Sequence, residues 1–261
     1  MKRVLTALVL VPAVVWLCLE APQLLLTAAV ALVASLCFRE FRRLAAAHAG
    51  SHTDACPIHI PCPLGYAAGL LILLVPTVHV SLLFLLCALA AILALRAPDL
   101  KSVLPSVSAF ALSLIYIYGA WRCAIELRLI APHLLLYALS INWIGDVAAY
   151  LTGSAIGRHK LAPRVSPGKS WEGFFGSLLA TTAYGIAFLH YCQPSMPLHY
   201  SAALSASANV AGQLGDLVES AMKRGAGMKD SGHMLPGHGG WLDRLDSSLF
   251  TLPYVYFWLR L

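Results

Sequence analysis

Residues Val4–Phe38 read VLTALVLVPAVVWLCLEAPQLLLTAAVALVASLCF, two apolar runs joined by the short link EAP. A run of roughly 16–20 apolar residues is long enough to cross a bilayer, because an α-helix rises about 1.5 Å per residue. Lys2 and Arg3 before the first run resemble the start of a signal peptide. No clear small-residue cleavage site ends that run, however, and a second apolar run follows at once. We therefore expect two transmembrane helices here.

The rest of the chain continues this apolar character. Hydrophobic residues make up 59% of the sequence, charged residues make up 11%, and the mean hydropathy is +0.74. A soluble domain carries about 25% charged residues. The composition therefore predicts an all-α, polytopic bundle of about nine transmembrane helices. We expect them near residues 4–19, 22–38, 63–79, 81–95, 103–120, 132–152, 173–192, 200–219 and 247–260.

The distribution of Lys and Arg orients these helices. With the N-terminus in the cytoplasm, fifteen of the eighteen Lys and Arg residues fall in inside segments, and only Arg122, Arg128 and Arg260 fall outside. Cytoplasmic loops of membrane proteins carry such an excess of positive charge. We expect N-terminal transmembrane helices over 1–130 and a catalytic transmembrane domain over 131–261, with cytoplasmic motif loops at 153–172 and 220–246.

The net charge of +6 is then explained by this topology together with an anionic ligand. Nucleic-acid binding is not expected, because no basic stripe is interleaved with aromatic residues. Two of the seven cysteines, Cys56 and Cys62, are part of the pattern His52-x3-Cys56-x2-His59-x2-Cys62. These are zinc-binding residue types at short spacing. Three prolines in the same stretch favour a plain loop, and both interpretations stay open.

The strongest concentration of charge is Gly215–Asp246, GDLVESAMKRGAGMKDSGHMLPGHGGWLDRLD. Asp216 and Glu219 are three residues apart and share one helix face. Asp243 and Asp246 repeat that spacing near the start of the last apolar run. Two acidic pairs at one membrane face are suited to a divalent cation, since Mg²⁺ takes oxygen ligands and substrate phosphates. Internal salt bridges within the motif are the alternative.

A second motif lies upstream, at Asp146–Gly173. Asp146 and Tyr150 are one helical turn apart, so we expect both to line a polar cavity. A lone Asp paired within the bundle is the alternative. The hydroxyl of Ser166, the ammonium of Lys169 and a tight Pro-Gly turn can hold phosphate oxygens. A basic loop that anchors the chain at the inner face is the other interpretation. The triplet Gly-Lys-Ser is not a P-loop, because the rest of that pattern is missing.

At these residues the chain resembles the phosphatidate cytidylyltransferase (CDP-diacylglycerol synthase) family. Ser170 stands where Thr is commoner in the family, and Arg158 stands where Lys is expected. The resemblance is specific over 146–176 and 212–250, and residues 1–140 share only the helical character. The longest matching run is Ser220-x2-Lys223-Arg224-x4-Lys229-Asp230-x5-Pro236-x-His238-Gly239-Gly240-x2-Asp243-Arg244-x-Asp246.

The resemblance implies a reaction, in which CTP and phosphatidate give CDP-diacylglycerol and pyrophosphate. It also implies dependence on Mg²⁺, with a second cation left open, and a homodimer. By position, Asp216 and Asp243 match metal-binding residues, and Ser220 and Lys223 match the catalytic centre. Asp246 is the further candidate metal ligand. The candidate substrate-binding residues are Ser166, Lys169, Arg224, Lys229, His238 and Arg244.

Two other functions remain as alternatives. One is a related enzyme, either a polyprenol kinase or a cytidylyltransferase for another lipid phosphate. The other is an ion-coupled transporter using Asp146, Asp216 and Glu219. A transporter predicts inverted repeats with broken helices, and the sequence shows none. We expect an integral protein of a bacterial cytoplasmic (inner) membrane whose active site faces the cytoplasm.

Overall fold

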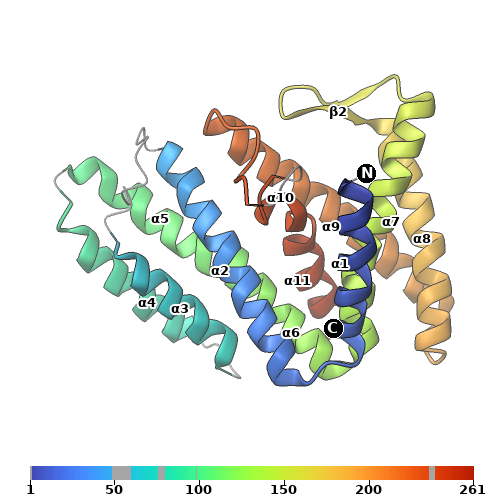
Figure 1. Cartoon of the computed structure of the whole chain (residues 1–261), viewed down its shortest axis with the longest axis horizontal. Coiled ribbons are helices and arrows are strands. Elements are labelled where there is room, and N and C mark those ends of the chain that lie inside the picture. The colour runs from blue at the N-terminus through green and yellow to red at the C-terminus, as the bar shows by residue number, and fades with distance from the viewer. Residues whose placement is uncertain (1, 49–59, 76–79, 98, 235–238) are drawn as a thin grey trace. The chain divides into compact units, whose positions relative to one another are not determined.

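The computed structural model describes residues 2–48, 60–75, 80–97, 99–234 and 239–261 (Figure 1). Its contacts divide the chain into two compact units. Unit 1 comprises Met1–Pro22, Glu126–Ala221 and Leu245–Leu261, and unit 2 comprises Gln23–Ile125 and Met222–Arg244. These units are defined by contacts and not by function. The catalytic domain expected from residue 131 onward therefore stays a prediction.

Unit 1 is built around one central helix. This helix, α7, packs against three others, α1, α8 and α11. Its buried residues Leu135, Tyr137 and Ile141 form the apolar core together with Leu189 and Leu252. The helices of the unit are α1 (Lys2–Leu19), α7 (Pro132–Ile156), α8 (Trp171–Cys192), most of α9 (Leu198–Gly225) and α11 (Ser248–Trp258).

Polar side chains join the helices of unit 1 at the wall of the cavity described later. Asn209 Nδ2 donates a hydrogen bond to Ser177 Oγ at 2.9 Å, and both residues are buried. A Cβ at Gly145 would lie 2.8 Å from Asn209 Nδ2 and 2.9 Å from Ser177 Oγ. Glycine therefore allows α7 to approach α8 and α9 closely, as small residues do between membrane helices.

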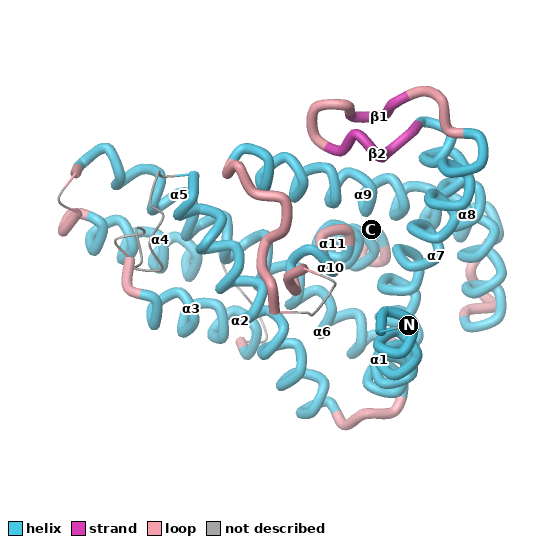
Figure 2. Tube along the Cα trace, turned by 45° about the horizontal axis from the view of Figure 1, so that its top comes forward, coloured by secondary structure: helices cyan, strands magenta, loops and turns pink. Residues whose placement is uncertain are grey.

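Between α7 and α8 the chain forms a β-hairpin, β1 (Lys160–Ala162) and β2 (Ser166–Ser170), drawn as the magenta segments in Figure 2. The sequence predicted only a loop in this part of 153–172, and an all-α fold. The expectation of a helical bundle is confirmed, and the hairpin is an addition to it.

The hairpin also corrects the predicted Pro-Gly turn. Lys160 pairs with Ser170 and Ala162 pairs with Ser166, so the pairing advances two residues along β1 but four along β2. Residues 167 and 168 lie in this irregular part of β2, and the turn is at residues 163–165. Proline has no N–H to donate, so a strand accommodates it at an edge or a bulge, where that hydrogen bond is not needed.

Unit 2 packs α2 against α3 and α5. Phe38 on α2 makes an edge-on contact with Tyr66, with ring centroids 5.0 Å apart, and it also contacts Tyr118. Three of its helices are α2 (Gln23–His48), α3 (Cys62–Leu74) and α4 (Val80–Ala94). A continuous run follows as η1 (Leu100–Ser102), α5 (Val103–Ser113), the π-helical η2 (Leu114–Gly119) and α6 (Ala120–Ile130), and the short α10 (Leu242–Leu245) comes last.

A helix lies at each of the nine predicted windows within the described residues. Four helical stretches are long and apolar enough to cross a membrane: Gln23–His48, Leu100–Ile130, Pro132–Ile156 and Trp171–Cys192. Large apolar side chains such as Leu24 and Phe84 are 83% and 70% exposed, as expected for helices that face lipid. The total of nine spans and the cytoplasmic N-terminus stay predictions.

The possible zinc site lies almost wholly outside the described residues. His52, Cys56 and His59 belong to that part of the chain, and Cys62 begins α3. No disulfide bond joins the cysteines that the structure describes.

Candidate active site

A cavity of about 320 Å³ opens in unit 1, between α7, α8, α9 and β2. Asp146 and Tyr150 line it from α7, as their helical spacing predicted, and Gly153 lines it as well. Lys169 and Ser170 line it from the hairpin, and polar residues of α9 line the opposite side. The volume falls at the lower end of the range of about 300–1,000 Å³ that is usual for small-molecule sites.

Within this cavity the two sequence motifs meet. Lys169 Nζ lies 2.5 Å from Asp216 Oδ2, and the two side chains are 25% and 26% exposed. Ser220 Oγ donates a hydrogen bond to the other oxygen of Asp216 at 3.2 Å. Three of the predicted site residues are thus in direct contact. The Asp216 carboxylate accepts from an ammonium and a hydroxyl, while the Lys169 ammonium supplies positive charge at the cavity wall.

The hairpin that carries Lys169 is held against the start of α8. Ser170 caps that helix, since its Oγ accepts a hydrogen bond from the N–H of Gly173 at 3.2 Å. Glu172 Oε1 lies 2.6 Å from His159 Nδ1, and the same carboxylate accepts a bond from the His159 N–H. These contacts orient Lys169 toward the cavity. Ser166, the other predicted residue of this motif, is on β2 but does not line the cavity.

Asp246 lies where several carboxylates of unit 1 act on one another. Its removal from water raises its pKa well above the usual value, and the carboxylates of Asp216, Glu219 and Asp146 raise it further. The N–H of Ser247 donates to Asp246 Oδ1 at 2.7 Å and acts in the opposite direction. A cation between Asp216 and Asp246 would relieve this repulsion.

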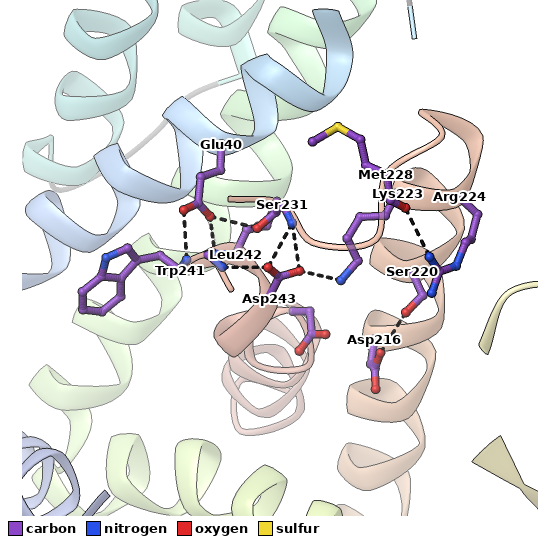
Figure 3. Close-up of polar contacts among 12 residues, drawn as sticks. Glu40, Asp216, Ser220, Lys223, Arg224, Met228, Ser231, Trp241, Leu242 and Asp243 are labelled. Atoms are coloured by element: carbon purple, nitrogen blue, oxygen red, sulfur yellow. Dashed lines mark hydrogen bonds and ion pairs between the residues drawn. The ribbon is translucent and has the colours of Figure 1, made fainter. Parts of the chain in front are cut away.

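A second polar cluster belongs to unit 2 and is centred on Asp243 (Figure 3). Lys223 Nζ lies 2.6 Å from Asp243 Oδ1. The backbone N–H groups of Ser231 and Gly240 donate to Asp243 Oδ2 at 2.9 and 2.8 Å. Burial alone would raise the pKa of Asp243, but the hydrogen bonds from Lys223, Gly240 and Ser231 lower it below the usual value. Asp243 is therefore held as a carboxylate.

Glu40 on α2 binds the same stretch of chain from the other side. It is fully buried. Its Oε2 accepts hydrogen bonds from the Leu242 N–H at 2.8 Å and from Ser231 Oγ at 3.0 Å, and its Oε1 accepts one from the Trp241 N–H at 3.1 Å. Glu40 was not among the residues predicted from the sequence. Glu40 follows the predicted span 22–38 and lies between Arg39 and Arg42, where a carboxylate looks like an ordinary charge at the membrane edge, so no sequence signal singled it out.

The match to known families decides what kind of protein holds these clusters. A model described as the Cytidylyltransferase family matches residues 1–261. The chain belongs to the cytidylyltransferase family.

Curated relatives point the same way. Three proteins named phosphatidate cytidylyltransferase are similar to this cytidylyltransferase-family chain. That of Staphylococcus aureus (strain COL) is 42% identical over 144 residues, 55% of each chain. That of Bacillus subtilis (strain 168) is 42% identical over 153 residues, 58% of this chain and 57% of the relative. That of Staphylococcus haemolyticus is 44% identical over 123 residues, 47% of each. The match spans about half the length of these relatives.

Three of the remaining predicted site residues of this cytidylyltransferase-family member are at the surface. Arg224 is exposed and donates to the Met228 carbonyl oxygen at 3.3 Å. Lys229 and Arg244 are exposed as well. His238 lies outside the described residues. The structure thus brings Lys169, Asp216 and Ser220 together in unit 1, and Lys223 and Asp243 together in unit 2.

The carboxylates near the cavity form the donor set for the predicted metal ion. Among the described residues, no group of three or more His, Cys, Asp or Glu side chains is arranged to hold a metal ion. Two carboxylates, Asp216 and Asp246, fit Mg²⁺ all the same. That ion is usually bound by one or two carboxylates, with waters and substrate phosphates completing its shell. A metal shared by Asp216 and Asp243, which belong to different units, stays a prediction from the resemblance.

Proposed function

We propose that this chain is a phosphatidate cytidylyltransferase, which converts CTP and phosphatidate to CDP-diacylglycerol and pyrophosphate in a bacterial cytoplasmic membrane. The single observation that carries the proposal is the Lys169–Asp216 pair in a cavity of unit 1. It joins the two motifs that resemble the family, in a chain that the family model matches throughout. The site facing the cytoplasm and the homodimer are further parts of the proposal.

The reaction needs positioning and charge neutralisation more than proton transfer. An anionic phosphate oxygen of phosphatidate attacks the α-phosphorus of CTP in line, forming one P–O bond. The bond from the α-phosphorus to the bridging oxygen breaks, and pyrophosphate leaves with that electron pair. Because the nucleophile is already anionic, no strong general base is required. Fixed charges and hydrogen-bond donors aimed at the phosphates then supply most of the acceleration.

Side chains in and beside the cavity fit these tasks. The Lys169 ammonium binds phosphate oxygens by a charge-assisted hydrogen bond. Ser220, through its bond to Asp216, holds that carboxylate in orientation. Mg²⁺, when bound by Asp216 and Asp246, would neutralise part of the phosphate charge. The roles that the resemblance implies for Lys223 and Asp243 at the catalytic centre belong to the same proposal. Arg224, Lys229 and Arg244 would offset the remaining negative charge.

The assay that tests the proposal uses purified protein in detergent, with labelled CTP, Mg²⁺ and one lipid at a time. The lipids are phosphatidate, a prenyl phosphate and a prenyl alcohol. We expect a labelled lipid and pyrophosphate with phosphatidate, and loss of both with Asp216→Asn. Glu20→Gln, a similar change at an exposed carboxyl, is the control. Product only with the prenyl phosphate would move the substrate assignment, and phosphorylation of the alcohol would indicate a kinase. Folded protein inactive with all three lipids would overturn the proposal.

A further inference from the structure

Ser231 lies between two buried carboxylates of unit 2, as Figure 3 shows. Its N–H donates to Asp243 and its hydroxyl donates to Glu40. The next donors along the chain are divided in the same way, because the Gly240 N–H donates to Asp243 and the N–H groups of Trp241 and Leu242 donate to Glu40. The two carboxylates therefore hold one loop from opposite sides.

We propose that Glu40 is a positioning residue for cytidylyl transfer, which sets the loop so that Asp243 and Lys223 keep their orientation. The inference rests on the proposed function and adds a residue from the part of the chain that resembles the family only in helical character. Glu40 acts through the loop backbone and through Ser231. It lies 191 residues before Ser231.

The loop backbone lies so close to the Glu40 carboxylate that no side chain fits between them. A Cβ at Gly232 would lie 2.6 Å from Glu40 Oε1, and a Cβ at Gly240 would also overlap Glu40. Both positions carry glycine, which alone permits so close an approach of backbone to a ligand group. Glu40 is fully buried, so its carboxylate and not water accepts from the Ser231 hydroxyl and from the N–H groups of Trp241 and Leu242. Unpaired donors at this depth would each cost about 1–3 kcal/mol.

The helix that carries Glu40 is a rigid support. The flanking residues Phe38 and Phe41 are 2% and 4% exposed. Phe38 contacts Tyr66 and Tyr118, and Phe41 contacts Tyr116 at a ring distance of 6.2 Å. A group placed on such a packed helix holds its partners more precisely than a loop residue does, which is what a positioning role requires.

Glu40→Gln is the central variant, because it keeps the size of the side chain. The amide has one accepting oxygen, so its NH₂ must face at least one of the three donors. With Lys223 and Asp243 released from their orientation, kcat should fall about 10–100-fold, since misplacement by about 1 Å can cost 10². The KM for CTP should change little. Glu20→Gln, at an exposed carboxyl, should leave kcat unchanged.

Hydrogen exchange separates positioning from the reaction itself. In folded Glu40→Gln, the amides of Ser231, Gly240, Trp241 and Leu242 should exchange faster than in the wild type, while those of α7 should not. This readout holds whatever the substrate is. A wild type without transfer activity would overturn the proposed function, and faster exchange would still establish that Glu40 holds the loop.

A double variant tests whether Glu40 acts through Asp243. Residues that act through one another are non-additive, so Glu40→Gln with Asp243→Asn should be no slower than Asp243→Asn alone. Additive losses of kcat in the double variant would overturn the proposal, and so would wild-type kcat and exchange rates in Glu40→Gln.

If Glu40→Gln does not fold, Ser231→Ala decides, because it removes only the hydroxyl that donates to Glu40. Ser231→Ala should lower kcat by a smaller factor than expected for Glu40→Gln, and it should speed amide exchange at residues 241 and 242. A kcat and exchange rates equal to those of the wild type would overturn the proposal.

Discussion

Lys169 Nζ and Asp216 Oδ2 lie 2.5 Å apart, which joins the β-hairpin between α7 and α8 to the C-terminal half of α9. The pair lines a cavity in unit 1. Only a folded chain brings these residues together, since neither motif contains both. Their contact turns two stretches of charged sequence into one site.

Removing the Lys169 charge should impair turnover. Lys169→Met is expected to lower kcat/KM about 10²–10³-fold, the usual cost of losing one donor to a charged transition state. The measurement is steady-state kinetics with CTP and phosphatidate. Lys160→Met removes an exposed charge from the same hairpin and should stay near the wild type. Equal losses in both variants would show that only the overall charge of the hairpin matters.

The Lys223–Asp243 pair should stabilise the fold as well as serve the reaction. Lys223→Met leaves the Asp243 carboxylate without its ammonium partner, and we expect a loss of about 1–3 kcal/mol. Thermal unfolding in detergent measures it. The double variant with Asp243→Asn should be more stable than Lys223→Met alone, because it removes the uncompensated charge. A double variant less stable than both single variants would contradict this account.

The lowered pKa of Asp243 predicts a dependence of stability on pH. A carboxyl whose folded pKa lies below its usual value of 3.8 contributes stability above that value and loses it as the pH falls through the folded pKa. Between about pH 5 and about pH 3, the unfolding temperature of the wild type should therefore fall more than that of Asp243→Asn. Parallel curves would show that Asp243 contributes nothing to acid unfolding.

Removal of divalent cations should abolish activity without unfolding the protein. Since substrate phosphates are expected to complete the shell of Mg²⁺, EDTA should stop product formation while the unfolding temperature changes little. Added Mg²⁺ should restore activity, and it should raise the unfolding temperature more with CTP present than without it. Full activity in EDTA would remove the metal from the mechanism.

Close packing of α7 against α8 and α9 should make Gly145 intolerant of substitution. A Cβ there meets Asn209 and Ser177, so Gly145→Ala should destabilise the protein by about 1–3 kcal/mol through overpacking. Gly168→Ala is the matched control, because nothing lies within 4 Å of the Cβ that it would add. Thermal unfolding of both variants provides the test, and equal stability of the two would show that the helices can separate at no cost.

The sequence predicted the features that depend on local pattern. The apolar windows indicated helices because membrane helices need long apolar runs, and the spacing of Asp146 and Tyr150 indicated a shared face. The hairpin was missed because its strands are short and polar, and because Pro167-Gly168 has the composition of a turn. The partners of Asp216 and Asp243 could not be read from spacing, since Lys169 and Lys223 reach them through the tertiary fold.

The buried carboxylate on α2 has a consequence for exchanging parts between relatives. Consider a hybrid that joins the first helices of one relative to the motif loop of another. The residue at position 40 and the loop that it binds would then come from different parents. Because three donors of the loop end at Glu40, such a hybrid should work only when both pieces come from the same parent. We therefore expect the early helices and the loop to be exchangeable only as a pair, even though the conspicuous motifs lie far from those helices in the sequence.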